Sequence, residues 1–119
     1  MTDLERDEES GKVCVILSTC PLGSAEEIAQ FLVENRHAAC VNIVPQVTSI
    51  YRWEGRLEKE SESLLVVKCS RSGAKEAIRA LVEKHPYDVP EVVAMRVVDG
   101  NPEYLDWVCD CVAAPRQGS

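Results

Sequence analysis

The chain has 119 residues, with 13 Lys+Arg against 20 Asp+Glu, a formal net charge of −7, and 45% hydrophobic residues. A chain of this length is expected to form one soluble domain whose core needs neither disulfides nor a structural metal. Nucleic-acid binding requires a basic stripe, whereas the basic residues here are scattered among acids, so no nucleic-acid partner is expected. No apolar run approaches the roughly 20 residues that span a bilayer, so no membrane helix is expected either.

Acidic charge is concentrated in residues 1–11, which hold five acids and one base. This composition predicts a disordered acidic tail. The expected domain then spans residues 12–113, and residues 114–119 form a flexible tail. Residues 1–11 lack the basic start and apolar stretch of a signal peptide and the acid-poor composition of a transit peptide, which favours a cytoplasmic protein.

Six cysteines would allow three disulfides in a secreted protein, but free thiols are expected in a reducing cytosol. Cys109 and Cys111 are spaced like one half of a zinc site. Structural zinc sites usually show two such pairs, and side chains two residues apart on a helix point in different directions. A zinc site is therefore not expected.

The first predicted element is a buried strand, because residues 13–17 form a continuous apolar run that Pro21 and Gly23 end. Residues 24–27, Ser-Ala-Glu-Glu, are typical of a capping box. Apolar residues then follow at helical spacing, which predicts a helix to about Arg36.

A long antiparallel hairpin is predicted next. β-Branched residues recur over residues 38–53, and Pro45 indicates a bulge or bend within this strand. Residues 54–55, Glu-Gly, supply the turn, and the returning strand reaches the apolar residues 64–67.

The remaining predicted elements are a second helix, a fourth strand and a terminal helix. Apolar residues between positions 74 and 82 match a helical face, and Pro86 ends that helix. Residues 92–98 are typical of a strand, and residues 101–102, Asn-Pro, begin the last helix. The order β-α-β-β-α-β plus a helix predicts an α+β, ferredoxin-like fold: an antiparallel sheet with helices on one face and a carboxyl-terminal helix.

Four motifs occur in an order and spacing that resemble the CutA family of divalent-cation tolerance proteins: residues 38–45, 49–55, 85–91 and 100–107. The resemblance covers residues 13–112. It implies a ferredoxin-like subunit assembled into a tight homotrimer, a link to copper and other divalent cations, and no established catalytic reaction.

Two aromatic residues, Tyr51 and Trp53, lie near the tip of the predicted hairpin. One interpretation packs both rings on the chain's own helices. The preferred one places them at a subunit interface formed by strand pairing, because an exposed apolar edge needs a partner. This interpretation agrees with the trimer that the resemblance implies.

A candidate metal site lies in the proline-bounded segment 85–91. Two prolines make this segment rigid, His85 offers an imidazole that suits copper or zinc, and Glu91 offers an oxygen. Cys20 could add a thiolate, because the first and fourth strands are expected to be neighbours. The alternative is that His85 is an ordinary residue at a helix end that interacts with the helix dipole.

The leading functional hypothesis is a noncatalytic homotrimer that binds divalent cations, preferentially copper, with no obligatory cofactor. The alternative is a trimeric small-molecule sensor like the PII signalling proteins, although the turn at residues 54–55 leaves no long mobile loop. An enzyme such as an acylphosphatase is less favoured, because residues 18–24 contain no base to hold a phosphate.

Overall fold

The computed structural model describes residues 12–112 and contains four strands and three helices along the chain. In order these are β1 (Val13–Pro21), α2 (Ala25–Glu34), β2 (Cys40–Trp53), β3 (Arg56–Ser70), α3 (Ala74–Lys84), β4 (Val93–Arg96) and α4 (Pro102–Val112). The predicted tails, residues 1–11 and 114–119, lie outside the described residues. Among the described residues, no helix is long and apolar enough to cross a membrane.

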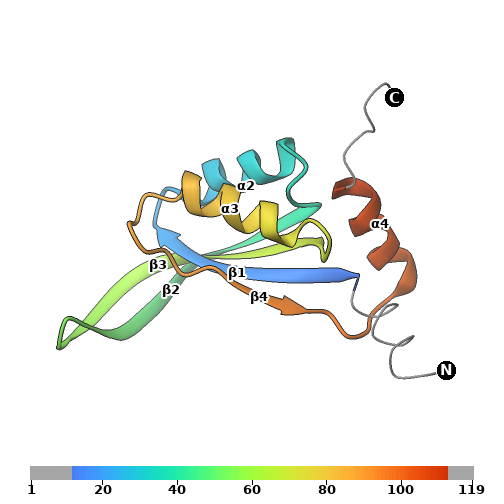
Figure 1. Cartoon of the computed structure of the whole chain (residues 1–119). Helices are drawn as coiled ribbons and strands as arrows, with labels where there is room; N and C mark the ends of the chain where they lie inside the picture. Colours follow the sequence, from blue (N-terminus) through green and yellow to red (C-terminus); the bar gives the residue numbers. More distant parts are fainter. Residues whose placement is uncertain (1–11, 113–119) are drawn as a thin grey trace.

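The four strands form one antiparallel sheet in the order β2-β3-β1-β4. Helices α2 and α3 lie side by side on one face of the sheet, and α4 lies beyond one end of it (Figure 1). The predicted α+β, ferredoxin-like fold is confirmed. Because β1 and β4 are hydrogen-bonded neighbours, the predicted proximity of the first and fourth strands is also confirmed.

The core lies between the sheet and its two helices. Its largest fully buried side chains come from both layers: Ile16, Leu65 and Val67 from the sheet, and Ile28, Leu32 and Leu81 from the helices. Burying each such side chain contributes about 1.5–3 kcal/mol. Every second side chain of the central strands points into this core, because successive side chains of a strand point to opposite faces of the sheet.

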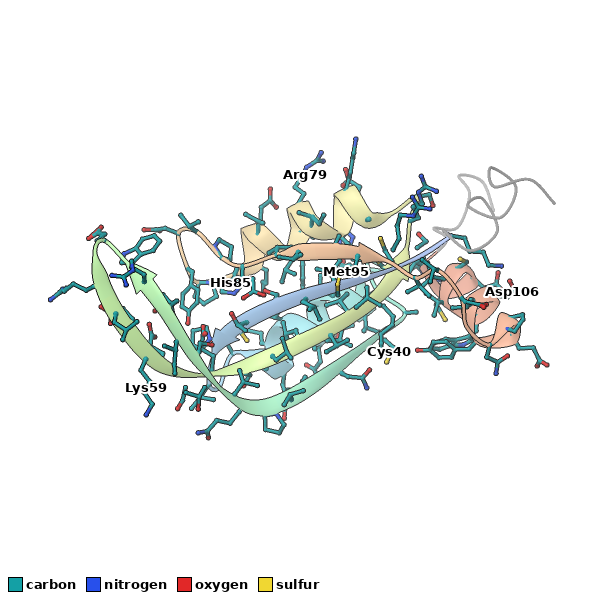
Figure 2. All side chains as sticks on the ribbon, turned by 90° about the horizontal axis from the view of Figure 1, so that it is seen from below. Cys40, Lys59, Arg79, His85, Met95 and Asp106 are labelled. Atoms are coloured by element: carbon teal, nitrogen blue, oxygen red, sulfur yellow. The ribbon has the colours of Figure 1, made fainter. Side chains whose placement is uncertain are left out.

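The opposite face of the sheet carries no helix and is largely apolar. Cross-strand pairing places Val15 beside Met95 and Leu17 beside Val93 on this face. Val93 and Met95 are 49% and 45% exposed. Figure 2 views the molecule from this side, which we call the open face.

The hairpin of β2 and β3 projects past the helices (Figure 1). Its turn has positive φ at both central residues, 49° at Glu54 and 79° at Gly55, as in the tight turns that match the twist of paired strands. The pairing register shifts between Val44 and Val47, so the irregularity predicted at Pro45 is confirmed.

Three local predictions need correction. Ser24 makes no side-chain capping bond, because its backbone is helical (φ −97°, ψ −15°) rather than extended as capping requires. Helix α2 ends at Glu34, and Arg36 adopts a left-handed φ of 60°. The fourth strand covers Val93–Arg96 rather than residues 92–98, and it pairs with residues 14–17 of β1.

The start of α4 agrees with the sequence pattern. Asn101 directly precedes Pro102, the first residue of α4. Its side chain accepts a hydrogen bond from the backbone N–H of Glu103 at 3.1 Å. Cys109 and Cys111 of this helix are free thiols, and burial is the main cause that raises the pKa of Cys109.

Candidate functional site

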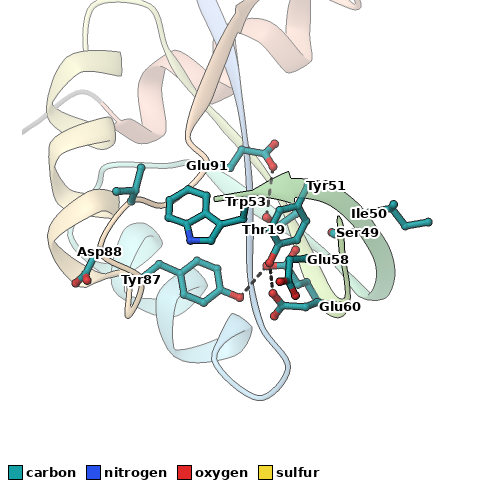
Figure 3. A pocket seen from close by; sticks show the side chains of 12 residues that line it. Thr19, Ser49, Ile50, Tyr51, Trp53, Glu58, Glu60, Tyr87, Asp88 and Glu91 are labelled. Atoms are coloured by element: carbon teal, nitrogen blue, oxygen red, sulfur yellow. Dashed lines mark hydrogen bonds between the residues drawn. The ribbon is translucent and has the colours of Figure 1, made fainter. Parts of the chain in front are cut away.

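A groove of about 740 Å³ lies between the β2–β3 hairpin and the loop that joins α3 to β4 (Figure 3). Its lining is acidic, aromatic and partly apolar: Thr19, Ser49, Ile50, Tyr51, Trp53, Glu58, Glu60, Glu62, Tyr87, Asp88, Val89 and Glu91. We call it the acidic groove. A hollow with convergent polar groups is the default place to look for a binding site.

Strand alternation brings the carboxylates of the hairpin together. Glu58, Glu60 and Glu62 occupy every second position of β3, so their side chains share one face. Tyr51 is the cross-strand partner of Glu58 and lies on the same face. Leu64 continues this row, so the groove adjoins the open face of the sheet.

Two tyrosine hydroxyls hold two of these carboxylates. The Tyr51 hydroxyl donates to Oε1 of Glu60, and the Tyr87 hydroxyl donates to Oε2 of Glu62 at 2.8 Å. The bond to Glu60 raises the pKa of Tyr51 to about 12. Burial, followed by the bond to Glu62, raises the pKa of Tyr87 as well. Both phenols therefore stay protonated at neutral pH and remain donors.

Glu62 is the most enclosed acid of the groove, with 5% of its surface exposed. Its Oε2 atom accepts a hydrogen bond from the Tyr87 hydroxyl. On the other side of the groove, Oε1 of Glu91 accepts a hydrogen bond from the Thr19 hydroxyl at 3.4 Å.

His85 is buried and both of its ring nitrogens are occupied. The Tyr87 backbone N–H donates to Nδ1 at 3.1 Å, so Nδ1 carries no proton. The proton is therefore on Nε2, which donates to the Thr19 carbonyl oxygen at 2.8 Å. In this arrangement the imidazole presents no free lone pair to a metal ion.

The other two predicted ligands are Cys20 and Glu91, and they lie on opposite sides of the sheet. Cys20 points to the helix-covered face and is fully buried, whereas its neighbour Thr19 points to the groove and contacts Glu91. Burial, followed by the charge of Glu62, raises the pKa of Cys20, which keeps the thiol protonated. Nowhere in residues 12–112 are three His, Cys, Asp or Glu side chains grouped to hold a metal ion. The structure thus does not bring His85, Glu91 and Cys20 together as a ready site within one subunit.

The two predicted interface aromatics are exposed in the single chain, Tyr51 by 37% and Trp53 by 54%. Both line the acidic groove (Figure 3). Sequence reasoning had identified these aromatics but missed the acids opposite them. The available signal was the acid at every second position of residues 58–62, a spacing that places charge on one face of a strand.

The chain is a small α+β domain built on a ferredoxin-like sheet, with the acidic groove beside its projecting hairpin. The chain belongs to the CutA1 divalent ion tolerance protein family, whose model matches residues 14–111. The family is named for ion tolerance and not for a catalytic reaction.

Similar proteins occur in bacteria and animals. The divalent-cation tolerance protein CutA of Thermus thermophilus is 51% identical over 98 residues, which cover 79% of this chain and 92% of that protein. The CutA homolog of Xenopus laevis is 47% identical over 105 residues, covering 87% of this chain and 69% of that protein. The mouse protein CutA is 46% identical over 99 residues, covering 82% and 56%. The chain thus spans little more than half of the mouse protein.

Solved structures show the same fold. CutA from Xylella fastidiosa superposes with a TM-score of 0.82 at 43% identity, covering 85% of this chain and 98% of that one. The PII-like protein CutA from Nostoc, in apo form, superposes with a TM-score of 0.80 at 36% identity, covering 83% and 96%. The fold is therefore shared with other CutA proteins, and the Nostoc protein among them is described as PII-like.

Proposed function

We propose that the chain works as a noncatalytic homotrimer in tolerance to divalent metal ions, copper among them. The observation that carries the assembly is the open face, where Val93 and Met95 leave apolar surface in water on the side of the sheet without helices. Exposed apolar surface of this kind is typical of an interaction site.

The sheet also offers two different open edges for pairing. β2 and β4 are the outer strands of the order β2-β3-β1-β4, and each has one edge without a neighbouring strand in the described chain. Pairing the β2 edge of one copy with the β4 edge of the next uses two unlike surfaces, and such contacts close into a ring when the rotation permits. The projecting hairpin, which carries Tyr51 and Trp53, extends far enough from the core to contact a neighbouring subunit.

Light scattering tests the assembly. Wild-type protein is expected at three times the mass of one chain, and the double variant Val93→Lys/Met95→Lys is expected to dissociate, because two charges would enter the interface. Val82→Lys is the matched control, since Val82 is 43% exposed but lies on α3, on the other side of the molecule. A wild-type protein that is a well-folded monomer at micromolar concentration would overturn the trimer.

Copper binding through His85, with Glu91 and Cys20 as further ligands, stays a prediction with a defined structural requirement. A metal ion at the imidazole has to replace either the hydrogen bond to the Thr19 carbonyl or that from the Tyr87 N–H. Binding is therefore expected to open the segment that follows α3. Cupric ion leads the divalent affinity order for imidazole ligands, which is why copper is the metal we propose.

A PII-like sensor of small molecules is the second candidate, and the PII-like description of the Nostoc structure favours it. The charge of the acidic groove disfavours a nucleotide as the ligand there, because its five carboxylates would repel the phosphates. A cytoplasmic location is likewise a proposal, because a chloroplastic CutA is known from Arabidopsis thaliana and a periplasmic one from Archaeoglobus fulgidus.

A further inference from the structure

We draw no further inference here: the strongest candidate, the side-chain cluster at the start of β2 in which the Cys40 thiol and the Lys68 ammonium both donate to the side-chain oxygen of Asn42, lies on the open face that the proposed trimer covers, and nothing in residues 12–112 shows a ligand for its single thiol.

Discussion

At the scale of single residues, His85 shows how a side chain with metal-binding chemistry can be committed to structure. It receives a hydrogen bond at Nδ1 from the Tyr87 backbone and donates one from Nε2 to the Thr19 carbonyl. These two bonds join the end of α3 to β1 and hold Tyr87 where its hydroxyl reaches Glu62. His85 thus orders one wall of the acidic groove.

Replacing His85 by Ala is expected to weaken copper binding and to destabilise the fold by about 1–3 kcal/mol, since two hydrogen bonds of about 0.5–1.5 kcal/mol each are lost. His37→Ala is the control, because His37 lies in the loop between α2 and β2. Copper titration and urea denaturation measure the two effects separately. Cys20→Ser tests the third predicted ligand: copper binding weakens if the Cys20 thiolate is a ligand and stays like wild type if the buried thiol only packs in the core. Equal copper binding in all four proteins would exclude His85 as a ligand.

At the scale of elements, the hairpin positions the groove, and its turn sets the pairing register. Trp53 pairs with Arg56 across the turn, and each further pair follows in step to Val47 and Glu62. A slip of one residue would turn the row of glutamates away from the groove. The positive φ of Gly55 is therefore a condition for the site as well as for the turn.

Gly55→Ala is expected to destabilise the protein by about 1–2 kcal/mol, because an L-residue with a side chain is strained at φ 79°. The added Cβ would meet no atom within 4 Å, so the cost comes from the backbone alone. Gly100→Ala is the comparison, since its Cβ contacts only Leu105 side-chain atoms at 3.4 Å or more. Urea denaturation at fixed protein concentration measures both. Equal stability of Gly55→Ala and wild type would contradict the strain at this turn.

At the scale of the whole molecule, the single chain is asymmetric: its sheet has helices on one face and apolar side chains in water on the other (Figures 1 and 2). Its hairpin extends beyond the core and carries a half-exposed indole at Trp53. In the proposed trimer these surfaces are covered together, so assembly and folding are coupled, and the melting temperature should rise with protein concentration.

Trp53→Ala is expected to weaken the assembly by roughly 2–4 kcal/mol if the indole is a central anchor of the interface. Trp107→Ala is the matched control, since Trp107 is 45% exposed but lies on α4. Dissociation on dilution, followed by light scattering, compares the two variants. An unchanged mass and melting temperature for Trp53→Ala would place Trp53 outside the interface.

The order of the elements, the bulge at Pro45 and the turn at residues 54–55 were predictable from the sequence alone. These features depend on local chemistry: the period of apolar residues, the missing N–H of proline and the freedom of glycine to adopt positive φ. The family was predictable too, because its motifs are contiguous in the chain.

Tertiary structure decided which side chains meet. Cys20 and Thr19 are neighbours in sequence, yet pairing with β3 and packing under the helices place Cys20 in the core and Thr19 beside Glu91. The acidic groove depends on a register between β2 and β3 and on a loop that arrives from α3. Contacts between residues so far apart in the chain have no local signature, because the free energy that selects them comes from packing and pairing over the whole sheet.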